Sequence, residues 1–276
     1  MKIIEANGAR MPALGFGTWT LNGEQCVDMV SKAIQTGYRH IDTAAKYENE
    51  EAVGEGIRAS GIARSEIFLT TKVWFTDIAE GALQRSAEAS LKRLGVDQVD
   101  LLLIHWPSRE VSVEESVKAL NDAASRGYAR HIGLSNHTTS QMEKAVQVSE
   151  HPIICNQVEY HPCLDQDLVL EACRKYGMAL TSYCPLYRGG ELMSHPAITG
   201  PAEAHGKSPA QIVLRWHMQQ QNVAAIPRTS SPSHMEQNFQ VFDFELTQAE
   251  MDAIMALRSK GDRICDFDFS PDWDQA

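Results

Sequence analysis

Four side chains in the sequence could together protonate a carbonyl oxygen. Asp42, Lys72 and His105 each close a short apolar run, and Tyr47 follows Asp42 five positions later. A phenol has a pKa near ~10 and is a proton donor at neutral pH, and a neighbouring ammonium group would lower that pKa. If the apolar runs are strands that end at one edge, the four groups form a general-acid site.

Each of the four groups has a distinct expected role. Lys72 supplies positive charge beside Tyr47, and Asp42 pairs with Lys72, which keeps the ammonium group protonated and oriented. His105 can donate a hydrogen bond to the same carbonyl oxygen. This set matches carbonyl reduction, and because it contains no hydride source the reaction requires a cofactor. Taken singly, each residue also has a purely structural explanation, such as a helix cap for Asp42.

The elements that must position these groups alternate regularly along the chain. Eight apolar runs of strand length are separated by amphipathic stretches, several of which end on glycine as helices often do. The expected strands are residues 13–18, 38–42, 67–72, 99–105, 131–136, 153–157, 178–183 and 223–228. The clearest helices are expected at residues 23–37, 49–61, 80–95, 112–127 and 208–221.

This alternation predicts an α/β protein, a (β/α)8 TIM barrel with its active site at the carboxyl ends of the strands. Asn7-Gly8 between two short strand-like pieces predicts an N-terminal β-hairpin over the opposite end. An extra C-terminal helix and tail should follow the barrel, and we expect residues 1–276 to form a single domain. A doubly wound sheet is the alternative, but the motif that begins at Gly15 lacks the third glycine of a dinucleotide fingerprint.

Composition excludes several functional classes. Hydrophobic residues make up 43% and charged residues 22% of the 276-residue chain, as in an ordinary globular protein. The net charge of −11 has the wrong sign for a nucleic-acid-binding protein. No apolar run is long enough for a membrane span, no signal peptide is evident, and the six cysteines lack zinc-site spacing. We expect a cytoplasmic protein without a metal site that acts on a small molecule.

The motifs resemble those of the aldo-keto reductases along nearly the whole chain. The matching pieces, in chain order, are GFGTW, IDTAAKYENE, LTTK, LLLIHWP, IGLSN, NQVEYHP, SYCPL and IPRTSSPSHMEQNF. The chain is most similar to short bacterial members that reduce 2,5-diketo-D-gluconate, methylglyoxal and related carbonyls. By this resemblance Tyr47 is the proton donor, Lys72 lowers its pKa, Asp42 supports Lys72, and His105 orients the substrate. Family members are often monomers, and we expect a monomer here.

The resemblance also implies the residues that bind a nicotinamide cofactor. Ser135, Asn136 and Gln157 would meet the carboxamide group, and Tyr183 would stack on the nicotinamide ring. The other implied cofactor residues are Gly17, Thr18, Asp42, Leu186, Arg228, Thr229, Ser230, His234, Gln237 and Asn238.

The chain departs from the family pattern where relatives grip the 2′-phosphate of NADPH. Arg228 stands at the family's lysine position and keeps a positive charge, but the usual arginine is replaced by His234. Imidazole is largely neutral near pH 7, so this second charge is weakened. Gln237 replaces an acid often found near the adenine amine, whereas Asn238 matches. We therefore expect NADPH to be preferred by a smaller margin than in relatives, with NADH also accepted.

Aromatic residues just past the strand ends are expected to line the substrate pocket. They are Trp19, Trp74, Trp106 and Tyr187, beside Tyr47 and His105, and Trp273 in the tail could join them. Residues 186–208 form the longest irregular connection and are expected to close over the cofactor. Arg188 in this connection could meet an acidic substrate.

Two other functions remain open from the sequence. An aldolase-type barrel would use Lys72 to form a Schiff base, although pairing with Asp42 would keep the amine charged and weaken it as a nucleophile. A noncatalytic barrel that binds the nucleotide as a ligand is the second alternative. The complete set of four groups argues against a purely binding role.

Overall fold

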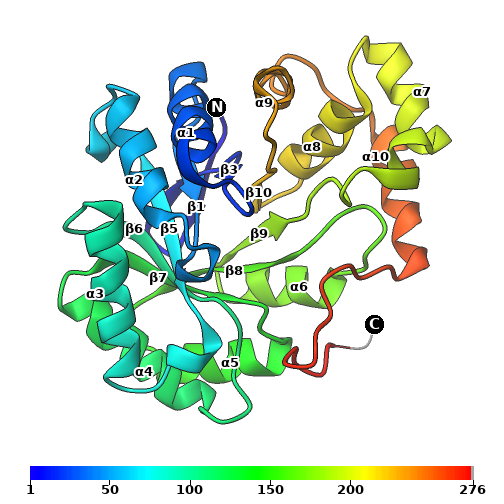
Figure 1. Cartoon of the computed structure of the whole chain (residues 1–276). Coiled ribbons are helices and arrows are strands. Elements are labelled where there is room, and N and C mark those ends of the chain that lie inside the picture. The colour runs from blue at the N-terminus through cyan, green and yellow to red at the C-terminus, as the bar shows by residue number, and fades with distance from the viewer. Residues whose placement is uncertain (275–276) are drawn as a thin grey trace.

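Eight parallel strands form the centre of the computed structural model, which describes residues 1–274 (Figure 1). Neighbouring strands pair in chain order, as expected for successive strand–helix units. The strands are β3 Phe16–Gly17, β4 His40–Asp42, β5 Phe68–Val73, β6 Val99–Ile104, β7 Ala129–Ser135, β8 Ile153–Glu159, β9 Ala179–Tyr183 and β10 Val223–Ala225. All eight predicted strands are therefore present, although several are shorter than predicted.

The sheet closes into a barrel where its first and last strands meet. Leu14 forms a parallel bridge to Ala225, and the amide of Gly17 donates to the carbonyl oxygen of Pro227 at 3.1 Å. Glycine permits this close approach, because a Cβ on Gly17 would lie 2.8 Å from the carbonyl oxygen of Ile226. The predicted (β/α)8 barrel is confirmed.

Helices connect each strand to the next and cover the outside of the barrel (Figure 1). Those between strands are α1 Gly23–Thr36, α2 Glu50–Ala59, α3 Ala82–Leu94, α4 Val113–Ser125, α5 Thr139–Val148, α6 Asp167–Lys175, α7 Pro196–His205 and α8 Pro209–Gln219, and α9 Pro232–Phe239 and α10 Gln248–Met255 follow β10. Their apolar faces pack against the strands in one continuous core. Among residues 1–274, no helix combines the length and apolar character that a membrane crossing requires.

The N-terminal hairpin consists of β1 Ile3–Ala6 and β2 Ala9–Pro12, as the Asn7-Gly8 turn predicts. Both turn residues have positive φ, 44° and 87°, which a tight two-residue hairpin turn requires. The amide group of Asn7 donates to the carbonyl oxygen of Ile153 at 2.8 Å, and Ile153 begins β8. The hairpin therefore lies at the amino end of the strands, which leaves the carboxyl ends open for a site.

The connection at 186–208 differs from the prediction, because it is not irregular throughout. It contains α7, which begins with a proline in its first turn and ends at Gly206 with φ of 62°. A short 3-10 helix, Gly190–Ser194, precedes α7. Gly200 and Pro201 lie inside α7, and both residue types disfavour helices, so the sequence pattern concealed it.

The predicted C-terminal helix and tail are both present. After α10 the tail crosses the barrel at the carboxyl ends of the strands (red in Figure 1). The carboxylate of Asp274 accepts hydrogen bonds from the amide and hydroxyl of Thr139, at the start of α5, at 2.9 and 2.7 Å. Arg109, just past β6, donates to the carbonyl oxygen of Ser270 at 3.2 Å. The tail is thus fastened across the mouth of the barrel.

Candidate active site

Lys72 lies at the centre of a buried polar cluster at the ends of β4 and β5. Its ammonium group donates to Oδ1 of Asp42 at 2.5 Å, to the carbonyl oxygen of Thr43 at 2.9 Å and to the hydroxyl of Tyr47 at 3.4 Å. Lys72 is 0% and Asp42 is 1% exposed. Because β4 and β5 are adjacent parallel strands, their carboxyl ends bring the carboxylate and the amine to one place. With His105, these groups are called the Lys72 cluster (Asp42, Tyr47, Lys72 and His105).

Tyr47 ends a short 3-10 helix, Ala45–Tyr47, that follows β4. Asn49 holds this segment, because its amide group donates to the carbonyl oxygen of Thr18 at 2.8 Å and its Oδ1 accepts from the Thr43 hydroxyl at 2.8 Å. The sequence interpretation missed Asn49. An asparagine directly before α2 suggests an ordinary helix cap, but its side chain makes no cap hydrogen bond there.

Glu50 supports the cluster from the other side of β5. Its carboxylate accepts a hydrogen bond from the Thr71 hydroxyl at 2.5 Å and pairs with Arg93 of α3 at 2.7 Å. Glu50 occupies the first turn of α2, where a negative charge suits the helix dipole. It is also buried and ion-paired, so it fastens α2 to β5 and α3 behind Lys72.

The electrostatics of the cluster differ in one respect from the sequence expectation. Burial raises the pKa of Tyr47, Lys72 lowers it and Asp42 raises it again, and the net direction is upward. Lys72 thus acts on the phenol as expected, but burial outweighs its effect. Desolvation lowers the pKa of Lys72, yet Asp42 and Tyr47 raise it more, so the ammonium form is favoured.

His105 follows β6 and completes the cluster with a neutral imidazole. Its ring centroid lies 5.6 Å from that of Tyr47 and 5.1 Å from that of Trp74, both in edge-to-face arrangements. Desolvation holds the pKa of His105 well below its usual value, and Lys72 lowers it further. A neutral imidazole carries one N–H donor and one acceptor. Its Nδ1 is buried and has no hydrogen-bond partner among the described residues.

The predicted nicotinamide-binding residues form one hydrogen-bonded set with the Lys72 cluster. They are Ser135, Asn136, Gln157 and Tyr183. The amide group of Asn136 donates to the carbonyl oxygen of His105 at 3.0 Å, and its Oδ1 accepts from the Tyr183 hydroxyl at 2.8 Å. The amide group of Gln157 donates to Oδ2 of Asp42 at 2.8 Å. The structure therefore joins the ends of β4, β6, β7, β8 and β9 in one polar network.

Three other predicted cofactor residues lie along the rim of the barrel. Gly17 is at the seam between the first and last strands. The hydroxyl of Thr18 is buried and donates to the carbonyl oxygen of Asp42 at 3.0 Å, so its hydrogen-bond donor is already used within the protein. Leu186 lies just past β9 and packs partly buried against the core.

The predicted phosphate-binding residues lie between β10 and α9 and are mostly exposed. Arg228 is exposed and donates through Nε to the carbonyl oxygen of Trp19 at 3.0 Å. The helix cap of α9 is Ser231, because the Ser231 hydroxyl accepts from the His234 amide. Ser230, His234 and Gln237 are exposed, Thr229 is half-buried and Asn238 is buried. A guanidinium group, hydroxyls and a helix N-terminus in one place suit an anion.

Two of the four predicted pocket aromatics, Trp19 and Trp74, contact the Lys72 cluster. The ring of Trp19, 53% exposed, lies 4.8 Å from the ring of Tyr47, and Trp74 contacts His105. Trp106 packs against Trp273 with centroids 6.0 Å apart, as the sequence suggested for the tail. Tyr187 faces the C-terminal segment instead.

The aromatic cluster contains a further ring, Phe269, which the sequence interpretation missed. Its centroid lies 5.4 Å from that of Trp74 and 5.3 Å from that of Trp106. The sequence did contain one indication of this packing, because phenylalanines in an otherwise acidic tail are not expected if the tail is fully solvated. Phe269 makes the tail part of the wall above the cluster.

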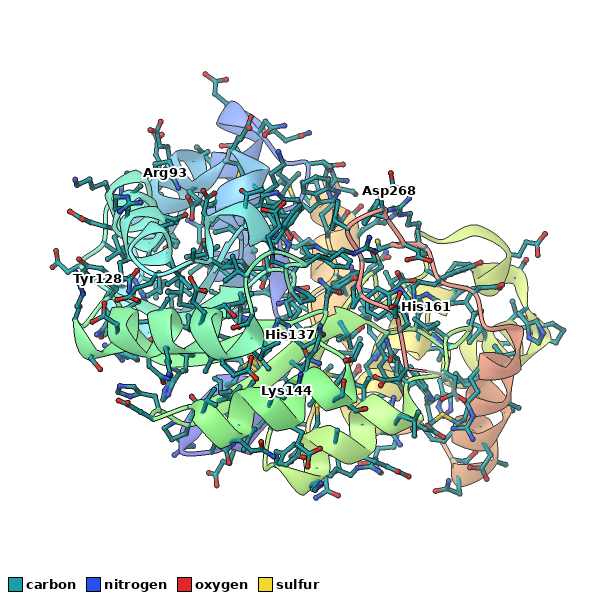
Figure 2. The ribbon with its side chains drawn as sticks, turned by 90° about the horizontal axis from the view of Figure 1, so that it is seen from below. Arg93, Tyr128, His137, Lys144, His161 and Asp268 are labelled. Atoms are coloured by element: carbon teal, nitrogen blue, oxygen red, sulfur yellow. The ribbon has the colours of Figure 1, made fainter. Side chains whose placement is uncertain are left out.

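Glu159, at the end of β8, anchors the tail and was also missed by the sequence interpretation. Its buried carboxylate accepts from the amides of Ile264 at 2.6 Å and Cys265 at 2.7 Å, and lies 2.9 Å from Nε2 of His161. Figure 2 shows His161 beside the red tail. Desolvation would raise the pKa of Glu159, but these hydrogen bonds lower it, and the net direction is downward. The only sequence feature that could have identified Glu159 was the presence of an acidic residue inside an apolar strand.

Tyr187 and Arg188 belong to the same tail contact. The hydroxyl of Tyr187 donates to Asp262 at 3.3 Å, and its ring centroid lies 4.7 Å from that of His161. The guanidinium group of Arg188 contacts the sulfur of Cys265 at 3.9 Å. Both residues therefore hold the tail in this structure.

Comparisons with known proteins agree with this architecture. The model of the Aldo/keto reductase family matches residues 13–194 and 195–259. The chain is 40% identical over 259 residues to a glyoxal reductase of Bacillus subtilis, which covers 94% of this chain and 92% of that protein. It is 40% identical over 260 residues to a morphine 6-dehydrogenase of Pseudomonas putida, covering 89% of this chain and 87% of that one.

A solved structure also matches the whole fold. It is described as a candidate 2,5-diketo-D-gluconic acid reductase B and is 44% identical, with a TM-score of 0.96 over 100% of this chain and 98% of that one. The family match covers most of the chain, and the similarity to individual proteins extends over the barrel and the tail. The chain belongs to the aldo-keto reductase family.

Proposed function

We propose that the protein reduces carbonyl compounds with a nicotinamide cofactor and uses Tyr47 as the proton donor. The observation that carries this proposal is the buried ammonium group of Lys72, which donates to Asp42 at 2.5 Å and to the Tyr47 hydroxyl at 3.4 Å. A fixed positive charge beside a phenol stabilises the phenolate that forms when the proton leaves. A general acid requires a phenol beside the ammonium group, whereas an ion pair with a purely structural role does not.

Each member of the Lys72 cluster has a defined step in the proposed mechanism. Tyr47 donates its hydroxyl proton to the carbonyl oxygen as negative charge develops there. Lys72 stabilises the phenolate, and Asp42 keeps Lys72 charged and aimed at the phenol. His105, held neutral by burial, donates a hydrogen bond to the same oxygen and orients the carbonyl group. A bound nicotinamide cofactor supplies the hydride.

The polar residues beside the cluster fit a nicotinamide group. Asn136 and Gln157 carry amide groups and Ser135 a hydroxyl, so together they offer the donors and acceptors that a carboxamide needs. The hydrogen bond from Tyr183 to Asn136 at 2.8 Å fixes the phenol ring of Tyr183 at the end of β9. A ring held at that position can stack on one face of the nicotinamide.

We further propose that NADPH is preferred over NADH, with a smaller margin than in relatives that carry an arginine at position 234. Arg228 is an exposed guanidinium group next to the N-terminus of α9, where it can form charged hydrogen bonds to a phosphate. His234, in the first turn of α9, brings a full second charge only when protonated. The remaining contacts would serve either cofactor.

The proposed substrates are small aldehydes and ketones, with methylglyoxal and 2,5-diketo-D-gluconate as the leading examples. Trp19 and Trp74 flank Tyr47 and His105, and the tail residue Phe269 closes the same side, which favours compact substrates. The relatives named glyoxal reductase and 2,5-diketo-D-gluconic acid reductase support this class. A Schiff-base mechanism is disfavoured, because the ion pair with Asp42 keeps the Lys72 amine charged.

The test is a turnover screen that compares the wild type with Tyr47→Phe. NADPH and NADH oxidation are followed with methylglyoxal, 2,5-diketo-D-gluconate and aromatic aldehydes. The substitution removes the acid and keeps the ring, so kcat/KM should fall by at least ~10²-fold while cofactor binding survives. Tyr128→Phe is the matched control, because Tyr128 directly precedes β7, at the amino end of that strand, and lies far from the tail residue Asp268 (Figure 2). Near-normal turnover by Tyr47→Phe would remove the phenol from the mechanism, and a wild type inactive with every carbonyl would favour a noncatalytic role.

A further inference from the structure

Two of the six cysteines meet where the tail crosses the end of β9. Cys184 directly follows β9, and Cys265 lies in the tail beside it, where each thiol affects the pKa of the other. The guanidinium group of Arg188 donates to the Cys265 sulfur at 3.9 Å. The other four cysteines, Cys26, Cys155, Cys163 and Cys173, are all buried, and the carbonyl oxygen of Cys163 accepts from the amide of Asp262 at 3.1 Å.

Glu159 fixes the relative position of the two segments that carry these thiols. It pairs with Tyr183 in the register between β8 and β9, and Cys184 is the next residue. The same glutamate accepts a hydrogen bond from the backbone amide of Cys265 at 2.7 Å. Cys184 has φ of 49°, a conformation that non-glycine residues rarely adopt. These contacts therefore hold the backbone of both cysteines in place at the end of β9.

The surroundings also distinguish Cys184 from the buried cysteines. The neighbouring Cys265 thiol lowers the pKa of Cys184, burial and Glu159 raise it, Arg188 lowers it, and the net direction is downward. By contrast, burial raises the pKa of Cys26 and of Cys155 to about 12. Cys184 is also only partly buried. Because the thiolate is the reactive form, Cys184 combines reactivity with access to small molecules.

We propose that Cys184 and Cys265 form a redox modification site that hydrogen peroxide converts to a disulfide. The thiolate sulfur of Cys184 attacks one peroxide oxygen, the O–O bond breaks, and the departing hydroxide takes up a proton to become water. Cys265 then loses its proton and its sulfur attacks the Cys184 sulfur, which breaks the S–O bond and releases a second water. The two thiols lose two electrons and two hydrogens, and the peroxide is reduced to two waters.

The disulfide would fasten the tail to the strand end beside the proposed nicotinamide site. The tail carries Phe269, which contacts Trp74 and Trp106, so its position determines how far the mouth can open. A covalent bond at Cys265 would hold this wall next to Tyr183. Oxidation should therefore lower turnover reversibly, because ligand entry and release require the mouth to open.

Peptide mapping tests the proposal without any assay of activity. The full-length protein is treated with hydrogen peroxide, remaining thiols are alkylated, and the digest is analysed by mass spectrometry before and after dithiothreitol. The expected product is a linked pair of the peptides that contain Cys184 and Cys265, two hydrogens lighter than the separate thiols. Dithiothreitol should abolish it. Absence of this link, or a dominant link between other cysteines, would overturn the proposal.

Three variants sharpen the assignment. Cys265→Ser should stop the reaction at oxidised Cys184, which a sulfenic-acid reagent detects, and Cys184→Ser should protect the protein from peroxide. Cys173→Ala is the matched control at a buried cysteine and should form the same link as the wild type. Equal peroxide consumption by Cys184→Ser and the wild type would contradict the assignment of Cys184. Because the link is read by mass, a protein that forms it but reduces no carbonyl would refute only the proposed function.

Discussion

The two ends of the proposed cofactor site are built in opposite ways. At the nicotinamide end, Lys72 and Asp42 are buried, and each polar contact leads to another through Gln157, Asn136 and Tyr183. At the phosphate end, Arg228, Ser230 and His234 are exposed. Only a few hydrogen bonds, such as that from Arg228 to the Trp19 carbonyl oxygen, order the residues there.

This difference in burial predicts where a substitution should reduce catalysis and where it should only change cofactor preference. Removing one partner of a buried ion pair leaves the other charge unpaired in the interior, which costs ~3–5 kcal/mol. An exposed side chain can be exchanged without such a penalty, since water replaces the lost partner. Chemistry should therefore be fragile at the Lys72 cluster, and cofactor preference should be adjustable at α9.

Lys72→Met should have the largest effect. The substitution removes the cation beside Tyr47 and leaves Asp42 buried without its partner. We expect kcat/KM for methylglyoxal to fall by more than ~10²-fold and the free energy of unfolding to fall by ~3–5 kcal/mol. Steady-state kinetics at neutral pH and urea unfolding measure the two effects. Wild-type rates in this variant would eliminate the proposed role of Lys72.

Lys46→Met is the matched control for that prediction. Lys46 is an exposed lysine near the same mouth, with its ammonium group 5.6 Å from the Trp74 ring centroid. It loses the same charge and gains the same side chain, but it has no buried partner. Its unfolding free energy should change by no more than ~1 kcal/mol, as for exposed ion pairs. An equal loss of unfolding free energy in Lys46→Met and Lys72→Met would mean that burial of the lysine does not explain the loss.

The nicotinamide end could be predicted from the sequence to a large extent, and there is a physical reason. In a parallel barrel the carboxyl ends of all strands meet at one face, so Asp42, Lys72 and His105 at strand ends had to converge. The net upward shift in the pKa of Tyr47 could not be predicted in this way. It depends on desolvation by groups that arrive from distant parts of the chain, which spacing along the sequence does not report.

The anchoring of the tail and the presence of α7 could not be predicted, for related reasons. The contact between Glu159 and the amides of Ile264 and Cys265 joins residues far apart in the chain, and each looks unremarkable in its local sequence. α7 has a glycine and a proline inside it, so local propensity pointed to a loop, and packing decided otherwise. At the phosphate end, exposed side chains follow no pattern, and only the family resemblance indicated them.

Asp42→Asn should cause a smaller loss than Lys72→Met. The amide can still accept a hydrogen bond from Lys72, so the ammonium group stays near Tyr47 but loses its counter-charge and part of its orientation. We expect kcat/KM to fall, while remaining above that of Lys72→Met, and KM for the carbonyl substrate to change little. Kinetics of both variants at one pH make the comparison. A loss as large as that of Lys72→Met would show that the carboxylate charge itself is essential.

The pH dependence of reduction tests whether burial or Lys72 dominates at Tyr47. Because the pKa of Tyr47 is raised in the folded protein, the phenol stays protonated up to and beyond its ordinary value near ~10. Its contribution to stability is complete below pH ~10 and is lost only as pH rises through the folded value. The rate of reduction should thus show no alkaline decline below pH ~10. A decline that begins near pH 8 would mean that Lys72 outweighs burial.

His234→Arg should have the smallest effect, confined to the cofactor's phosphate. An arginine in the first turn of α9 adds a permanent charge that can form hydrogen bonds to a 2′-phosphate. NADPH should bind more tightly by ~1–2 kcal/mol, roughly five- to thirty-fold, while NADH affinity scarcely changes because it lacks that phosphate. Cofactor titrations by protein fluorescence measure both affinities.

The wild type offers an internal check on the same charge. An imidazole carries a positive charge only when it is protonated, so the preference for NADPH should weaken as pH rises. The preference of His234→Arg should stay constant as pH rises, apart from ionisation of the phosphate itself. Gln240→Arg places the same added charge at the opposite end of α9 and should leave NADPH affinity nearly unaltered. If Gln240→Arg tightened NADPH as much as His234→Arg, general attraction would explain the gain. NADPH affinity at the exposed phosphate end would then depend only on net charge, and position 234 would have no specific part in cofactor choice.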